Sequence, residues 1–198
     1  MQTHVSAILL AAGSSRRMGQ CKQLLPLDGR PAIVRCLESI LAAGVAGITV
    51  VVGADGTEVE LAIAHLPVTV VLNTIYGSDM AGSVLVGLQR VGHKTSGILV
   101  CLADHPLIEA RTCRLLMEEH RRRPDAILIP TYQGRKGHPT LFPRTIIAEL
   151  AFLPTLRDVI GRHANRVRFL EVDDPAIVED MDTPADYRRL VARLAATL

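Results

Sequence analysis

Short apolar segments alternate with amphipathic helical patterns along most of the chain. The apolar segments are rich in Val, Ile and Leu, and several are continuously apolar, which is typical of strands covered on both faces. Strands are predicted at residues 5–10, 48–52, 68–72, 97–102, 126–130 and 167–172, and helices at residues 31–43, 80–91, 109–121 and 184–194. This alternation predicts a three-layer, doubly wound α/β fold with a mostly parallel sheet.

The predicted sheet also indicates where a ligand would bind. In open α/β sheets, ligands bind beyond the carboxyl ends of the strands. Functional residues are therefore expected in the loops that follow Leu10, Leu72, Leu102, Pro130 and Val172. No repeat, low-complexity stretch or linker divides the sequence, so residues 1–198 are expected to form one domain.

Composition narrows the classes of partner. The 198 residues are 48% hydrophobic and 21% charged, as in ordinary globular proteins. With no Trp, three Phe and three Tyr, the chain is a poor candidate for stacking single-stranded bases. The net charge is only +2, and the densest basic run, residues 121–123, fits a solvated helix end. Nucleic acid is not expected as a partner.

Nothing in the sequence indicates a membrane or an oxidising compartment. No apolar run approaches the roughly 18 residues of a membrane span, and the first residues lack the basic start of a signal peptide. Cys21, Cys36, Cys101 and Cys113 show neither a C-x-x-C pair nor the spacing of metal ligands. A reducing, cytoplasmic location is therefore expected, with no membrane partner.

The loop after the first strand is basic and rich in small residues. It reads Leu10-Ala11-Ala12-Gly13-Ser14-Ser15-Arg16-Arg17-Met18-Gly19-Gln20-Cys21-Lys22. Gly13 and Gly19 permit turns in which backbone N–H groups converge on an anion, while Arg17 and Lys22 add positive charge. Such a loop suits a triphosphate. The spacing matches neither a Walker A loop nor a G-x-G-x-x-G dinucleotide motif, and a solvated surface loop is the alternative.

Carboxylates follow two of the predicted strands. Asp104 comes just after the strand at 97–102, where it could hold a hard cation or cap the next helix. Asp180 and Asp182 follow the last strand and precede the sequence Thr183-Pro184-Ala185-Asp186, which has the pattern of a helix start. The helix start accounts for Thr183 and Asp186 but leaves Asp180 and Asp182 available for a metal.

The glycine loop and the residues after it resemble the signature of a known family. The pattern Leu-Ala-Ala-Gly-x-Ser-x-Arg-Met-Gly-x-x-Lys continues into Leu24-Leu25-Pro26-Leu27 and Gly29-Arg30-Pro31. It is similar to the molybdenum cofactor nucleotidyltransferases (MobA-like NTP transferases), above all the branch that attaches cytidylate to molybdopterin. Sugar-phosphate and isoprenoid cytidylyltransferases share a shorter version. The resemblance implies a nucleotide-diphospho-sugar transferase-like, Rossmann-like fold.

The resemblance also implies roles for individual residues. Leu10, Ala11, Ala12, Gly13, Arg17, Lys22, Asn73, Ser83 and Asp104 correspond to nucleotide-binding positions, and Arg17, Lys22 and Asp104 to catalytic ones. Asp104 and Asp180 would hold Mg²⁺ over the triphosphate, with Asp182 the less favoured ligand. Asp79 departs from the family, which often has Gly there. His138, in a Gly-His-Pro sequence, would bind the acceptor, although the residues alone also fit a hairpin tip.

The implied reaction is attack of an acceptor phosphate oxygen on the α-phosphorus of an NTP, with release of pyrophosphate. CTP is the favoured nucleotide, because Ala12 stands where guanylyl-transferring relatives have Gly. Molybdopterin is the implied acceptor, and a molybdoenzyme or its chaperone is a candidate protein partner. Two alternatives remain open: a sugar- or polyol-phosphate cytidylyltransferase, and a non-catalytic carrier that binds a nucleotide or cofactor.

Overall fold

The computed structural model describes residues 4–13, 18–53, 56–74 and 79–196. Within these residues an eight-stranded sheet has the order β10-β7-β9-β6-β1-β4-β5, with β8 paired to β7. The strands are β1 (His4–Ala11), β4 (Ile48–Val52), β5 (Thr69–Leu72), β6 (Thr95–Leu102), β7 (Ile127–Tyr132), β8 (Arg135–Lys136), β9 (Thr140–Pro143) and β10 (Val167–Glu171). A separate antiparallel pair joins β2 (Pro26–Leu27) to β3 (Arg30–Pro31).

Four neighbouring strands end at one edge of the sheet. Strands β6, β1, β4 and β5 are parallel, and their register places Leu10 beside Leu102. Val52 lies beside Leu72 in the same register. The loops that follow β1, β5 and β6 therefore meet at the carboxyl edge, where the sequence predicted a ligand.

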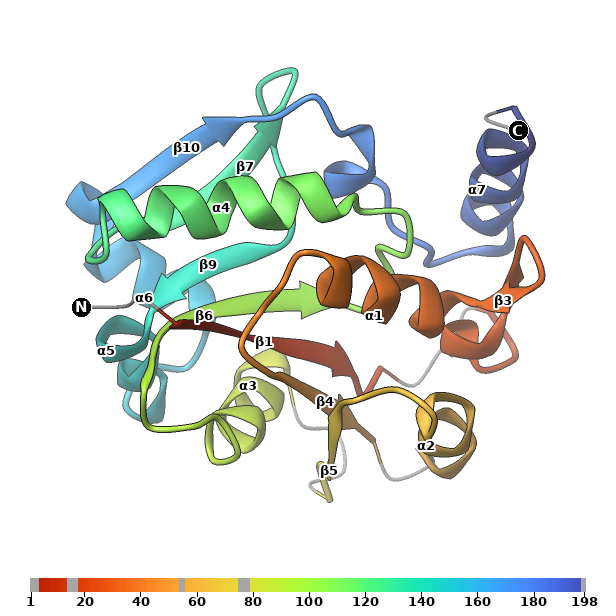
Figure 1. Cartoon of the computed structure of the whole chain (residues 1–198), viewed down its shortest axis with the longest axis horizontal. Coiled ribbons are helices and arrows are strands. Elements are labelled where there is room, and N and C mark those ends of the chain that lie inside the picture. Colours follow the sequence, from red (N-terminus) through yellow and green to blue (C-terminus); the bar gives the residue numbers. More distant parts are fainter. Residues whose placement is uncertain (1–3, 14–17, 54–55, 75–78, 197–198) are drawn as a thin grey trace.

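Helices cover both faces of the sheet (Figure 1). One face carries α1 (Ala32–Ala42), α2 (Thr57–Ile63) and α4 (Ala110–Arg122), and the other carries α3 (Met80–Leu88), α5 (Arg144–Ile147) and α6 (Leu156–Arg162). The 3₁₀ turns are η1 (Lys22–Leu24), η2 (Ala148–Ala151), η3 (Ala164–Arg166) and η4 (Pro175–Val178). The last helix, α7 (Pro184–Ala195), packs near the β2–β3 pair. The predicted three-layer α/β fold is confirmed.

Two apolar layers hold the sheet between the helices. Leu9 on β1 faces the layer that includes Leu37 of α1, and its neighbour Ile8 faces the layer that includes Val84 of α3. All of these side chains are buried. Successive residues of a strand point to opposite faces, so a strand covered on both faces has to be apolar at every position. This is why the apolar runs located the central strands correctly.

The sequence prediction missed β9, which lies inside the sheet. Strand β9 runs antiparallel to both of its neighbours, β6 and β7, and buries Leu141 and Phe142. It has four residues, follows Pro139 and ends at Pro143, so it lacked the long apolar run that revealed the parallel strands. Helices α2, α5 and α6 and the short strands β2, β3 and β8 were also not predicted.

The structure also bears on the predictions about a membrane span and about the cysteines. No helix in this part of the chain is long and apolar enough to cross a lipid bilayer. Cys21, Cys36, Cys101 and Cys113 are all free thiols, and the last three are buried. Burial raises the pKa of the Cys36 thiol well above its ordinary value and that of the Cys113 thiol to about 12, so both thiols stay protonated at neutral pH.

Candidate functional site

A cavity of about 200 Å³ lies at the carboxyl edge of the sheet. Its lining comes from the loop after β1, from η1, from the start of α3 and from the end of β6 and the turn after it. The lining residues are Leu10, Ala12, Gly13, Lys22, Gln23, Asp79, Met80, Ser83, Leu102, Ala103 and Asp104. Six residues that the sequence predicted for nucleotide binding are thus brought together from four segments. Ala11, also predicted, instead packs into an apolar layer.

Lys22 stands between two carboxylates. Its ammonium donates hydrogen bonds to Asp104 Oδ2 and to Asp182 Oδ1, each at 2.8 Å. Burial alone would lower the pKa of Lys22, but the charges and hydrogen bonds of the two carboxylates outweigh it and raise that pKa above its ordinary value. The side chain is therefore charged at neutral pH, and it places a cation at the wall of the cavity.

Backbone hydrogen bonds fix the turn that contains Asp104, one to the end of β1 and one from the segment before α7. Ala103 N–H donates to Leu10 O at 3.1 Å, and Met181 N–H donates to Asp104 O at 2.9 Å. Asp104 Oδ1 is buried and has no hydrogen-bond partner among the described residues. A buried carboxylate oxygen without a donor suits a hard cation, because an unsatisfied buried acceptor is otherwise costly. The alternative role as a helix cap does not apply, since the residue that begins α4 is Glu109.

The two later carboxylates lie in different surroundings. Asp182 contacts Lys22, whereas Asp180 is exposed to solvent. The cause is the capping box at the start of α7: Asp186 Oδ2 accepts hydrogen bonds from Asp182 N–H at 3.2 Å and from Thr183 N–H at 2.7 Å. The hydrogen bond from the Thr183 hydroxyl is the main reason why the pKa of Asp186 is lowered. The same contacts fix the backbone of Asp182, which shares Lys22 with Asp104, and the metal-binding role of Asp180 stays a prediction.

Gln23 anchors the glycine loop, and the sequence analysis did not single it out. The side chain is buried, and its Nε2 donates to Ala11 O at 3.1 Å and to Gly13 O at 3.3 Å. A glutamine has no distinctive chemistry in a sequence, so only the fold reveals this role. Ser14 to Arg17 lie outside the described residues, so the predicted nucleotide-binding and catalytic roles of Arg17 stay predictions.

Replacing Gln23 by Met is expected to lower the free energy of unfolding by about 1–2 kcal/mol, because two backbone carbonyls lose their donor. It is also expected to raise the KM for the nucleotide more than it changes kcat, since the loop loses its anchor. Urea unfolding and steady-state kinetics would measure both effects. Gln20→Met, at an exposed position, is the matched control. Equal stability of the two variants would contradict the anchoring role.

Asn73 and Ser83 contact each other at the start of α3. Both are buried, and Asn73 Nδ2 donates to Ser83 Oγ at 3.0 Å. Asp79, the departure from the family pattern, begins α3 by accepting a hydrogen bond from Gly82 N–H at 2.8 Å. Ser83 and Asp79 line the cavity, whereas Asn73 does not and contacts Ser83 through its amide. Their contacts with a nucleoside stay a prediction.

His138 lies near Asp104 but does not line the 200 Å³ cavity. It precedes a cis peptide bond to Pro139, and its ring centroid lies 5.4 Å from that of His105. His105 Nε2 in turn lies 3.9 Å from Asp104 Oδ1. Burial, followed by the neighbouring His105, lowers the pKa of His138 to about 4, so the ring is neutral at pH 7. The acceptor-binding role of His138 stays a prediction.

The described residues offer two carboxylates to a metal rather than a complete set of ligands. No group of three or more His, Cys, Asp or Glu side chains in this part of the chain is arranged to hold a metal ion. Magnesium sites in phosphoryl-transfer enzymes have the same character, since one or two carboxylates share the ion with substrate phosphates. Asp104 and Asp182 therefore fit a Mg²⁺ ion that arrives with a nucleotide.

Comparisons with known proteins extend over most of the chain. The family described as the MobA-like NTP transferase domain matches residues 7–167. A nicotine blue oxidoreductase from Paenarthrobacter nicotinovorans is 30% identical, over 94% of this chain and 96% of its own length. The molybdenum cofactor cytidylyltransferase of Escherichia coli K12 is 24% identical, over 92% of this chain and 93% of its own length.

Solved structures share the fold along its whole length. The Rv0371c protein of Mycobacterium tuberculosis H37Rv has a TM-score of 0.85 and 33% identity, covering 97% of this chain and 99% of that one. A structure of the same protein in complex with manganese has a TM-score of 0.79 and 30% identity, covering 97% and 100%. The predicted nucleotide-diphospho-sugar transferase-like fold is confirmed.

Proposed function

Because the chain belongs to the MobA-like NTP transferase domain family, a family of nucleotidyltransferases, we propose that it transfers CMP from CTP to molybdopterin or the molybdenum cofactor. The observation that carries this proposal is Lys22 held between Asp104 and Asp182 at the wall of the cavity. The proposed cofactor is Mg²⁺, with Asp104 and Asp182 as its protein ligands. The buried, unpartnered Oδ1 of Asp104 supports this assignment.

The proposed reaction replaces one phosphoanhydride bond with another. A phosphate oxygen of the acceptor attacks the α-phosphorus of CTP, the bond from that phosphorus to the bridging oxygen breaks, and pyrophosphate leaves. A phosphate monoester is already ionised near pH 7, so no general base is required. The obstacle is the approach of one anion to another, which the Lys22 ammonium and the loop N–H groups offset. Bound Mg²⁺ would supply further neutralisation of the triphosphate.

The family itself includes proteins with different nucleotides, so the base is a separate proposal. Ala12 lines the cavity, which supports the proposal that its methyl group takes space that a purine would need. Ala12→Gly is expected to shift the ratio of kcat/KM values toward GTP by a factor within about 10–200, without reversing the preference for CTP. A reaction in which CTP and GTP compete gives this ratio directly. Preference for GTP in the unchanged protein, or an unaltered ratio in the variant, would contradict the proposal.

The acceptor is proposed from the relatives. One relative is named a molybdenum cofactor cytidylyltransferase and matches most of this chain, which supports molybdopterin as the acceptor. We propose that the neutral imidazole of His138, which lies next to His105 and near Asp104, contacts this acceptor. The product would pass to a molybdoenzyme or its chaperone.

A second candidate function is an oxidoreductase. It is favoured by one observation, the 30% identity over most of the chain to a protein named nicotine blue oxidoreductase. The chain lacks a G-x-G-x-x-G motif, the usual site for a nicotinamide dinucleotide. Oxidation of NADH or NADPH with an electron-accepting dye would test this candidate. If the protein oxidised NADH or NADPH and released no pyrophosphate from any NTP, the oxidoreductase would replace the transferase as the proposed function.

Pyrophosphate release tests the transferase proposal itself. Each of the four NTPs would be mixed with Mg²⁺ and with molybdopterin, glucose 1-phosphate or erythritol 4-phosphate. The expected result is release from CTP with molybdopterin only. Release with a sugar or polyol phosphate instead would identify the alternative cytidylyltransferase. Nucleotide binding without release from any pair would leave a non-catalytic carrier.

A further inference from the structure

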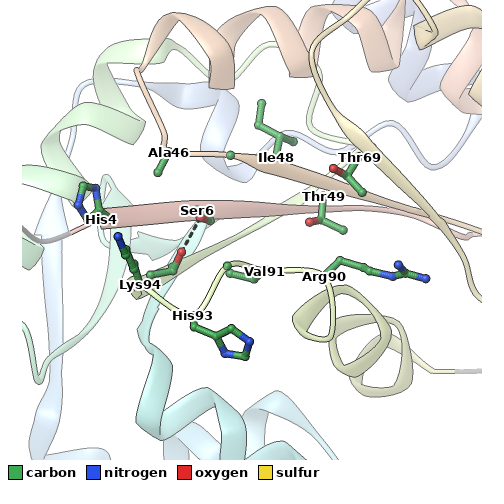
Figure 2. A pocket seen from close by; sticks show the side chains of 13 residues that line it. His4, Ser6, Ala46, Ile48, Thr49, Thr69, Arg90, Val91, His93 and Lys94 are labelled. Carbon is green, nitrogen blue, oxygen red and sulfur yellow. Dashed lines mark hydrogen bonds between the residues drawn. The ribbon is translucent and has the colours of Figure 1, made fainter.

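A second cavity opens at the opposite edge of the sheet, where the parallel strands begin (Figure 2). It has a volume of about 350 Å³, larger than the 200 Å³ at the carboxyl edge. Its walls come from the first residues of β1, β4 and β5 and from the loop between α3 and β6. His4 and Ser6 of β1 line this cavity, while Leu10 of the same strand lines the other. The second cavity is therefore separate from the candidate active site.

The rim of this cavity is positively charged. Arg90 and Lys94 come from the α3–β6 loop, which also contributes His93, and none of the lining residues is Asp or Glu. Neither cation forms an ion pair within the described part of the chain. Other exposed arginines do so, for example Arg30 with Glu38 at 2.8 Å and Arg189 with Asp186 at 2.7 Å. Among the described residues no carboxylate compensates the charge at the rim, and this charge favours an anion.

The floor of the cavity is polar although the surrounding layer is apolar. Ser6 and Thr49 are buried, and they lie on the sheet face that carries Ile8 and Val51 farther along the same strands. Ser6 Oγ and Thr95 Oγ1 form a hydrogen bond of 2.8 Å (Figure 2). The Thr49 hydroxyl lacks a hydrogen-bond partner among the described residues although the residue is only 4% exposed. Because Thr49 lines the cavity, its hydroxyl is available to a ligand there.

A simpler explanation accounts for only part of the rim. Arg90 follows the carboxyl end of α3, where a cation compensates the helix dipole. That effect fades beyond the last turn of a helix, so it does not explain Lys94, four residues farther on. Nor does it explain hydroxyl groups on the floor.

We propose that this cavity binds a small hydroxylated phosphate ester, such as a sugar phosphate. The phosphate would lie at the rim, where Arg90 and Lys94 supply positive charge from opposite ends of the cavity, since guanidinium and ammonium groups both bind phosphate oxygens strongly. The hydroxyl groups of the ester would exchange hydrogen bonds with Thr49 and with the Ser6–Thr95 pair. A volume of about 350 Å³ lies at the lower end of the range of small-molecule sites, which suits a ligand of this size.

Histidine NMR can test the proposal because the two edges of the sheet carry different histidines. His4 and His93 line the second cavity, and His105 and His138 lie near Asp104. The imidazole signals would be assigned with single His→Gln variants and followed during titration with glucose 6-phosphate, inorganic phosphate or glucose. Glucose 6-phosphate is expected to shift the signals of His4 and His93 saturably. It should bind more tightly than inorganic phosphate, and glucose should produce no shift.

Three variants sharpen the test. The double variant Arg90→Ala, Lys94→Ala is expected to raise the apparent Kd at least about tenfold, since it removes two charge-assisted contacts. Thr49→Val, which keeps the side-chain shape, should raise the Kd severalfold. Arg121→Ala removes an exposed cation on α4 and should leave the Kd unchanged. Equal affinity for inorganic phosphate and the ester would mean an adventitious ion only. Shifts that stay linear, or that the double variant keeps in full, would overturn the site.

Discussion

Asp104→Asn and Asp182→Asn are each expected to lower kcat/KM on the order of 10³-fold, whereas Asp180→Asn should retain near-normal turnover. Each of the first two variants removes a charged ligand from the proposed Mg²⁺ site, and losses of this scale follow removal of a preorganised electrostatic group. Asp180 is the matched control, because it lies in the same turn but is exposed and does not face Lys22. The comparison separates loss of a ligand from a general effect of reduced charge in this turn.

Pyrophosphate release and circular dichroism would be measured side by side for the three variants. Unchanged spectra are expected, since Asp104 lines the cavity, the Asp182 side chain is partly exposed and Asp180 is exposed. A loss in Asp180→Asn that equals the loss in Asp182→Asn would contradict the assignment of Asp182. Near-normal turnover by Asp104→Asn would remove the metal site altogether.

Lys22→Met is expected to lower kcat on the order of 10²-fold or more with little change in KM. The reason is that the ammonium stabilises charge that develops during transfer, while other groups hold the nucleotide in its ground state. The same variant should bind Mn²⁺ more tightly in the absence of nucleotide. In the structure Lys22 neutralises Asp104 and Asp182, so a metal ion has to compete with it for the same two carboxylates.

Steady-state kinetics and calorimetric titration with Mn²⁺ would measure the two effects of Lys22→Met. The control is Lys136→Met, which removes an ammonium that lies over the Phe169 ring, away from the cavity. A loss in kcat/KM of less than about threefold would show that Lys22 is not part of the catalytic machinery. Weaker Mn²⁺ binding by Lys22→Met would contradict the idea that ammonium and metal compete.

Much of the fold could be predicted because the central parallel strands are buried on both faces. That burial requires runs such as residues 97–102 and 126–130, which stand out in a sequence. Strand β9 could not be found in this way, because it follows Pro139, ends at Pro143 and gains its position from partners far along the chain. Helix α2 has only seven residues, too few to show a clear period.

The site was predictable in position but not in detail. The rule that ligands bind at the carboxyl ends of strands located the loops that contain Lys22, Ser83 and Asp104. The choice between Asp180 and Asp182 depended on the direction in which the Asp186 capping box turns the backbone, which the spacing of residues does not define. Thr49 gave no signal at all, because a β-branched residue is ordinary in a strand. Only the missing partner of its hydroxyl distinguishes it.

The reversed direction of β9 has a consequence for how this fold can evolve. A parallel strand brings its last residue to the functional edge, but β9 brings its first, so the segment before Thr140 reaches the turn that contains Asp104. The position of the glycine loop is set separately, by the parallel pairing of β1 with β4 and β6. Insertions or deletions at residues 133–138 can therefore change the surroundings of His105, next to Asp104, while the glycine loop stays unchanged. The segment before β9 can thus diversify in evolution while the glycine loop after β1 remains constant.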